Sequence, residues 1–161
     1  MSKELRTALG CFATGVTIVT TRYNGRDYGM TCSSFNAVSL DPAMALWNIQ
    51  KNSHSLEAFE KSDGYTVSVL SAEQGDLAMH FTRGSHEERF AGLEESRLDS
   101  GRIVIPKCVA WFDCDLTQVI EAGDHAILLS NILEYGSSKD STGLIFERSQ
   151  FGSIQQLEKV A

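Results

Sequence analysis

The sequence lacks the features that mark several classes of protein. None of its four cysteines forms a Cys-x-x-Cys pair or stands near a histidine at metal-ligand spacing, so no metal site is expected. No apolar run approaches the roughly 18 residues that a membrane-spanning helix needs. The opening MSKELRTALG has no apolar core, and we expect no signal peptide. The reducing cytoplasm is the compartment that these absences favour.

Clustered positive charge is missing as well. The net charge is -7 and no basic run occurs, which argues against a nucleic-acid partner. Neither a GxGxxG fingerprint nor a GxxxxGK[ST] loop is present, which argues against Rossmann and P-loop nucleotide sites. With 161 residues, 42% of them hydrophobic, the chain is long enough for one domain with a substantial core.

Strand patterns dominate what is present. We expect strands at 16–22, 28–35, 43–49, 65–70, 109–120 and 126–135, and helices at 2–11, 53–62 and 71–81. Asn24-Gly25 is a hairpin turn signal, and the strand at 43–49 is expected to pair with one of the two strands before it. Residues 82–101 are expected to be irregular, as a lid or dimer arm. Short turns and few helices predict a mainly β fold with peripheral helices, an antiparallel β-barrel.

Residues 29–55, GMTCSSFNAVSLDPAMALWNIQKNSHS, are the most informative stretch. Thr31, Ser33 and Ser34 place hydroxyl groups close together on one strand. Such groups can hydrogen-bond a flavin ring without adding charge near its redox atoms. A solvated edge strand explains the same residues equally well.

The end of this stretch has the character of an anion site. Lys51, Ser53 and Ser55 lie where a strand ends and a helix is expected to begin. Free N–H groups, hydroxyls and a lysine there would attract phosphate. An ordinary helix cap is the alternative.

A histidine marks a third position of interest. His125 follows Gly123-Asp124 at the start of an expected strand. It could lie beside a nicotinamide and steer the hydride donor, or it could be a structural residue of the turn.

Six motifs follow one another in order. They are RTALGCFATGVTIVTT from Arg6, GMTCSSF with VSLDP from Gly29, Asn52-Ser53, RFAG from Arg89, Gly123-Asp124-His125 and Phe151-Gly152. Together they resemble the flavin reductases with the FMN-binding split barrel, which include the reductase components of two-component flavin monooxygenases. The resemblance implies that residues 1–161 form a single flavin-binding domain, an antiparallel split β-barrel.

The resemblance also implies a set of site residues. Those expected to hold the flavin ring and ribityl chain are Thr31, Cys32, Ser33 and Ser34, with Asn48, Ile49 and Gln50 lining it through backbone groups. Ser53 and Ser55 are expected to meet the phosphate, and Phe81 and Thr82 to lie near the flavin tail. His125, Phe151 and Gly152 are expected to frame the nicotinamide pocket, with Arg89 as a neighbour. Trp47 stands where the family usually has a smaller residue and is expected to narrow the ring slot.

The function that the resemblance implies is NAD(P)H:flavin oxidoreduction. Hydride passes from NADH or NADPH to FMN or FAD, and reduced flavin is supplied to a partner monooxygenase. A homodimer is expected. Two alternatives stay open: a reductase that retains its flavin and reduces ferric complexes or quinones, and a non-enzymatic flavin- or haem-binding barrel.

Overall fold

The computed structural model describes residues 2–94, 96–139 and 141–155. The helices are α1 (Lys3–Leu9), α2 (Leu56–Lys61), α3 (Gly75–His80) and α4 (His86–Phe90), with a 3-10 turn η1 (Ala72–Gln74). The strands are β1 (Thr14–Gly15), β2 (Thr17–Tyr23), β3 (Arg26–Cys32), β4 (Asn36–Leu40), β5 (Ala43–Gln50), β6 (Gly64–Val69), β7 (Ala110–Ala122), β8 (His125–Ser137), β9 (Leu144–Glu147) and β10 (Gln150–Ser153). None of the helices described here is long and apolar enough to cross a membrane.

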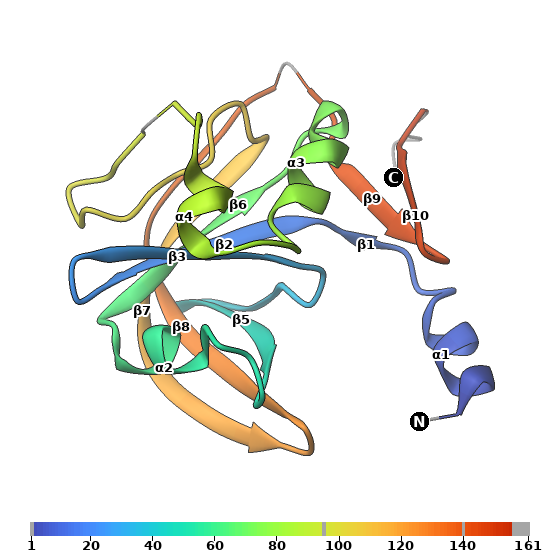
Figure 1. Cartoon of the computed structure of the whole chain (residues 1–161), viewed down its shortest axis with the longest axis horizontal. Coiled ribbons are helices and arrows are strands. Elements are labelled where there is room, and N and C mark those ends of the chain that lie inside the picture. Colours follow the sequence, from blue (N-terminus) through green and yellow to red (C-terminus); the bar gives the residue numbers. More distant parts are fainter. Residues whose placement is uncertain (1, 95, 140, 156–161) are drawn as a thin grey trace.

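Two antiparallel sheets make up the fold. The larger has seven strands in the order β3-β2-β6-β7-β8-β5-β4, and the smaller has the order β1-β9-β10. Figure 1 shows the small sheet to one side of the large one, with the β7–β8 hairpin curving away from it. At the chain crossing from β3 to β4, the Ser34 hydroxyl accepts a hydrogen bond from the Asn48 N–H of β5 at 2.9 Å. This contact ties the β3–β4 connection to β5, the strand next to the edge strand β4.

Local sequence explains much of this arrangement. Asn24 and Gly25 take positive φ values of 50° and 76°, as the two-residue hairpin between β2 and β3 requires. Strands β2 and β6 lie between other strands and are buried over most of their length. The main core packs Val19, Trp47 and Phe59 with Tyr65, Leu128 and their neighbours, and a second cluster around Phe81 fills the space below α3.

Four sequence-based expectations need correction. The strand at 43–49 pairs with β4 and β8 rather than with β2 or β3, because the turn at Asp41-Pro42 makes β4 and β5 a hairpin. Strand β4 itself was not expected as a separate element. The helix expected at 53–62 begins only at Leu56, and its N-cap Ser55 makes no side-chain capping bond. Residues 82–101 are not irregular throughout, since α4 lies within them.

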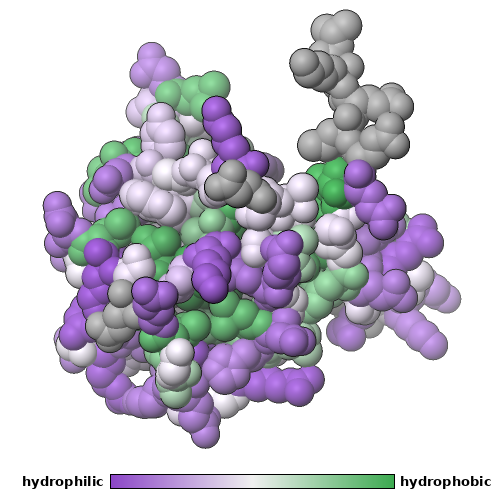
Figure 2. All heavy atoms as spheres, turned by 90° about the horizontal axis from the view of Figure 1, so that it is seen from above, coloured by the Kyte–Doolittle hydropathy of each residue, from purple (hydrophilic) through white to green (hydrophobic). Residues whose placement is uncertain are grey.

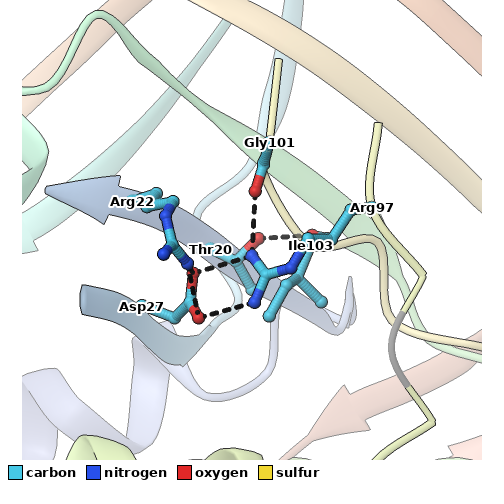
Figure 3. Close-up of polar contacts among 6 residues, drawn as sticks. All are labelled: Thr20, Arg22, Asp27, Arg97, Gly101 and Ile103. Carbon is cyan, nitrogen blue, oxygen red and sulfur yellow. Dashed lines mark hydrogen bonds and ion pairs between the residues drawn. The ribbon is translucent and has the colours of Figure 1, made fainter. Parts of the chain in front are cut away.

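Residues 96–105, called the clamped loop below, are bonded to the barrel at several points. Arg97 forms a two-point ion pair with Asp27, which also accepts from Arg22, and the Thr20 hydroxyl donates to the Ile103 carbonyl (Figure 3). Beneath this network the Arg102 guanidinium donates to Asp113 and to the Cys114 carbonyl at 2.8 Å.

Polar residues are spread over the surface. In the view from above, hydrophilic side chains surround smaller areas of hydrophobic ones (Figure 2). Inside, burial raises the pKa of the Cys114 thiol to about 12, so it remains a neutral core residue.

Candidate functional site

A cleft made of two adjoining cavities lies beside strand β3. The two cavities have volumes of about 560 and 790 Å³ and share Met30, Thr31 and Gln50. The smaller, which we call the neutral chamber, has no Asp, Glu, Lys or Arg in its lining, and is completed by Cys32, Ser33, Ser34, Asn48, Ala122, His125 and Ile127. The larger, which we call the charged chamber, is completed by Arg26, Asn52, Ser53, His54, Ser55, Phe81, Thr82, Gly84, Ser85, His86, Glu87 and Arg89.

His125 stands at the tip of the β7–β8 hairpin, where the strand register brings it to the neutral chamber. It lies opposite Gln50 of β5 and opposite Ala122 of β7. Its Nδ1 is 2.8 Å from the carboxylate of Asp124, and this hydrogen bond lowers the pKa of Asp124. Asp124 is therefore ionised at neutral pH and accepts the Nδ1–H, which fixes how the ring is held.

Two of the hydroxyls in the neutral chamber also hold the fold together. Thr31 Oγ1 donates to the Ala78 carbonyl at 2.5 Å and so binds β3 to α3. Ser34 Oγ bonds both backbone groups of Asn48 and lies 3.1 Å from Cys32 Sγ. These bonds fix the wall of the chamber, and Ser33 between them is exposed.

The side chain of Asn48 offers the chamber an unused acceptor. Its Oδ1 is buried and has no hydrogen-bond partner among the described residues. A buried carbonyl oxygen without a donor costs free energy, so a ligand that brings an N–H group there is stabilised. An isoalloxazine ring carries such a group, and the chamber fits a flavin in this respect.

The charged chamber is lined by hydrogen-bond donors and cations from three parts of the chain: β3, residues 52–55 and residues 81–89. Arg89 of α4 donates to the Gly29 carbonyl at 2.6 Å and to the Arg83 carbonyl at 3.0 Å. Burial lowers the pKa of Arg89, but a guanidinium stays protonated at neutral pH. Arg26 of β3 pairs with Glu87, and both side chains are exposed.

His86 lies between Ser55 and Arg89. Its Nε2 is 3.2 Å from Ser55 Oγ, its Nδ1 is 3.4 Å from the Arg89 guanidinium, and its ring contacts Tyr28 at 4.7 Å between centroids. Burial and the charge of Arg89 lower its pKa. Hydroxyls beside arginines make a site suited to an anion such as phosphate.

Comparison with known proteins decides the family. The model of the flavin reductase like domain matches residues 9–155. The chain belongs to the flavin reductase-like family. The resemblance inferred from the six motifs is thereby confirmed.

Relatives and a solved structure agree with this assignment. The chain is 38% identical to the FMN reductase (NADH) SmoA of Agrobacterium fabrum, over 96% of this chain and 87% of that one. It is 41% identical to the reductase component of the flavin-dependent trigonelline monooxygenase of Acinetobacter baylyi, over 84% of this chain. That match covers 44% of the Acinetobacter protein, so the chain spans less than half of its length.

The structural match supports the split-barrel fold. The Streptomyces globisporus NADH:FAD oxidoreductase SgcE6, in complex with NAD and FAD fragments, superimposes with a TM-score of 0.88 at 31% identity. The match covers 92% of this chain and 90% of that one. The expected mainly β split-barrel fold is confirmed, and the relatives' names support the class of NAD(P)H-dependent flavin oxidoreductases.

Most of the site residues expected from this family meet in the cleft. The neutral chamber brings together Thr31, Cys32, Ser33, Ser34, Asn48, Gln50 and His125. The charged chamber brings together Ser53, Ser55, Phe81, Thr82 and Arg89. Arg89, expected near the nicotinamide, therefore lies beside the residues expected to meet phosphate.

Phe151 and Gly152 line neither chamber of the cleft within one chain. Both lie on β10 in the three-stranded sheet, where Phe151 packs against Phe146 at 5.6 Å between ring centroids. The nicotinamide pocket expected between His125 and Phe151 is not formed by these two cavities.

Two residues of β5 face away from the cleft. Ile49 is 1% exposed and belongs to the core, so only its backbone could serve a ligand. Trp47 is fully buried between Phe59 and Tyr65. The expectation that Trp47 narrows the ring slot is wrong, because alternate residues of a strand face opposite sides and Asn48 holds the cleft position.

Sequence reasoning missed Arg26, His86 and the unpartnered side-chain oxygen of Asn48. A signal for His86 was present. Ser85 and Glu88 form a capping box, which starts a helix at His86 and puts His86 and Arg89 on one helical face at i, i+3.

Proposed function

We propose that this protein binds a flavin along the cleft and catalyses its reduction by NADH or NADPH. The proposal rests on the change in charge along the cleft. At Met30, Thr31 and Gln50 the neutral chamber meets the charged one. A flavin mononucleotide has the same division between a neutral ring and an anionic phosphate. When bound, the flavin supplies the redox chemistry by accepting hydride from the nicotinamide.

The protein's own residues would hold the flavin and orient the nicotinamide. Asn48 Oδ1 and the hydroxyls of Thr31, Ser33 and Ser34 would hold the ring edge. Ser53, Ser55 and Arg89 would hold the phosphate. His125, fixed by Asp124 at the chamber's rim, would orient the nicotinamide. Hydride transfer from a nicotinamide to a flavin needs no nucleophile from the protein.

The choice of flavin and donor is drawn from the relatives. One is named an FMN reductase with NADH and another an NADH:FAD oxidoreductase. We therefore include FMN and FAD as flavins and place NADH before NADPH as donor. The free cysteines agree with the reducing cytoplasm as the location.

A monooxygenase is the proposed consumer of reduced flavin, because a relative is named as the reductase component of one. The test is the affinity for flavin in both redox states. Weak binding of reduced flavin is expected, since it must leave. Tight retention with reduction of a ferric chelate or a quinone would favour the alternative acceptor.

A second copy of the chain is the proposed structural partner. Three strands in the same half of the large sheet expose large apolar side chains: Leu40 and Val38 on β4, Leu133 and Tyr135 on β8, and Ile120 on β7. Large exposed apolar areas often mark protein–protein interfaces. Sedimentation should show a dimer, and Leu40→Glu with Tyr135→Glu should shift it to monomer; a monomeric wild-type protein would contradict the proposal.

The central experiment mixes the protein with NADH and FMN, FAD or riboflavin without oxygen. Loss of the flavin's visible absorbance is expected. His125→Ala should slow hydride transfer or weaken NADH binding. If neither changes, His125 has no part in the reaction. Failure to oxidise NADH with any flavin would instead favour a non-enzymatic flavin- or haem-binding barrel.

A further inference from the structure

His86 has a defined hydrogen-bonding state that follows from its neighbours. A guanidinium can only donate, so the Arg89 contact at 3.4 Å requires a lone pair on His86 Nδ1. In the neutral ring the proton is then on Nε2, which donates to Ser55 Oγ at 3.2 Å. This fixes one lone pair of the serine oxygen. The proton of the Ser55 hydroxyl is left to point elsewhere.

Ser55 is well placed to use that proton. The residue is 4% exposed and lines the charged chamber, and its own N–H donates to Ser53 Oγ. Its hydroxyl therefore cannot rely on bulk water and needs an acceptor from within the chamber. A phosphate oxygen is such an acceptor. The guanidinium of Arg89, which could pair with the same phosphate, also contacts the His86 ring.

The charges around His86 oppose its protonation when the chamber holds no anion. From α4, Arg89 faces Nδ1 and Glu87 is its chain neighbour; from β3, Arg26 and Tyr28 lie on the same side. His54 also lines the chamber. The pKa of His86 is lowered by burial, by Arg89 and by Arg26, against the opposite influences of Glu87 and of the Gly29 backbone. The ring is thus mainly neutral at neutral pH.

We propose that His86 is a positioning residue that senses the flavin phosphate: it aims the Ser55 hydroxyl into the charged chamber and takes up a proton when the phosphate binds. A phosphate dianion beside Ser55 offsets the repulsion from Arg89 and favours the imidazolium. Phosphate binding and protonation of His86 then strengthen each other. This inference rests on the proposed function, because it concerns the phosphate end of the same ligand.

Two substitutions separate the two roles. His86→Gln supplies an N–H near the former Nε2 but cannot titrate. His86→Leu removes both the donor and the charge. His80→Gln is the matched control, since His80 is exposed and bonds the Glu88 carbonyl without lining the cleft.

The experiment measures the dissociation constants of FMN and riboflavin for these proteins between about pH 8.5 and about pH 5.5, the range in which a histidine titrates. Relative to His86→Gln, wild-type affinity for FMN should rise about ten-fold as pH falls, which equals a pKa change of about one unit. FMN's own phosphate titrates near pH 6, but it does so equally for every variant, so the ratio isolates His86.

The remaining outcomes are equally definite. His86→Leu should bind FMN about ten-fold more weakly at high pH, the loss expected for one charge-assisted or buried hydrogen bond, while riboflavin is little affected. Proton uptake on FMN binding, measured by calorimetry in buffers of different ionisation enthalpy, should be smaller in His86→Gln than in wild type and unchanged in His80→Gln.

Parallel pH profiles for wild type and His86→Gln would overturn the proposal even if His86→Leu failed to fold. If riboflavin and FMN bind with the same pH-independent affinity, this inference fails and the flavin site stands. If neither binds, the proposed function itself fails.

Discussion

Two neighbouring stretches that look alike in sequence do different work in this protein. Residues 81–90, called the cleft wall below, and the clamped loop at 96–105 both follow α3, and each carries two arginines among other polar residues. The cleft wall lines the charged chamber with its side chains. The arginines of the clamped loop form ion pairs with Asp27 and Asp113 of the barrel. None of the loop's residues lines either chamber.

The difference lies in where each arginine finds its partner. Arg102 pairs with a buried carboxylate, and the side chains of the pair are 11% and 7% exposed. Among the described residues Arg89 bonds two backbone carbonyls and the His86 ring but no carboxylate, so its charge remains available to an anion. A cation that bonds carbonyls is available for binding a ligand, whereas one that bonds a carboxylate serves stability. The predictions below test this division.

The largest effect is expected at the clamped loop. Arg102→Ala leaves Asp113 buried without its partner and should lower the free energy of unfolding by about 3–5 kcal/mol. Urea denaturation measures this. Flavin affinity of the folded fraction should be unchanged. The double variant Arg102→Met with Asp113→Leu is the control and should regain much of the stability; a variant that stays stable but loses flavin would contradict the division.

The second effect is expected at the cleft wall. Arg89→Ala removes a partly buried cation and should weaken FMN binding by about ten- to a hundred-fold, the range for a charge-assisted hydrogen bond. Riboflavin binding should change less than about two-fold because it has no phosphate. Fluorescence titration checks both. Arg83→Ala removes the same charge from an exposed position outside the lining, so an equal loss there would show that Arg89 acts only through net charge.

Sequence reasoning succeeded where local pattern and chemistry agree. Asn24-Gly25 forms its hairpin, and Thr31, Ser34 and Ser53 reach the cleft. It failed where pairing between distant strands decides the outcome. Strand β5 pairs with β8, and the paired residues Trp47 and Leu128 lie about eighty positions apart in the chain. Which face Trp47 takes likewise follows from that register, since a shift by one residue would exchange it with Asn48.

The third prediction concerns acid. Burial alone raises the pKa of Asp27, but hydrogen bonds from Arg97 and Arg22 outweigh it, so the pKa lies below its ordinary value. Its contribution to stability is therefore present above about pH 4 and is lost as pH falls through the lower folded value. Asp27→Asn should be less stable than wild type at neutral pH by at most about 1 kcal/mol, because the ion pairs are partly exposed.

The check on Asp27 is thermal unfolding at several pH values. The gap between wild type and Asp27→Asn should close in acid, and FMN affinity should be the same for both at neutral pH. A gap that does not depend on pH would mean that Asp27 acts by packing, and a loss of FMN affinity would show that the clamped loop supports the cleft after all.

The smallest effect is expected from Glu87, the one of the cleft wall's two glutamates that lines the charged chamber. It pairs with Arg26 in the exposed part of the charged chamber and partly neutralises it. Glu87→Gln should free Arg26 and strengthen FMN binding by about two-fold, as expected for one solvent-screened charge. Raising the salt concentration should erase the gain, and riboflavin should show none. Weaker FMN binding in Glu87→Gln would mean that the pair holds Arg26 in its binding position, so that this cation depends on a carboxylate and the contrast between the two stretches is incomplete.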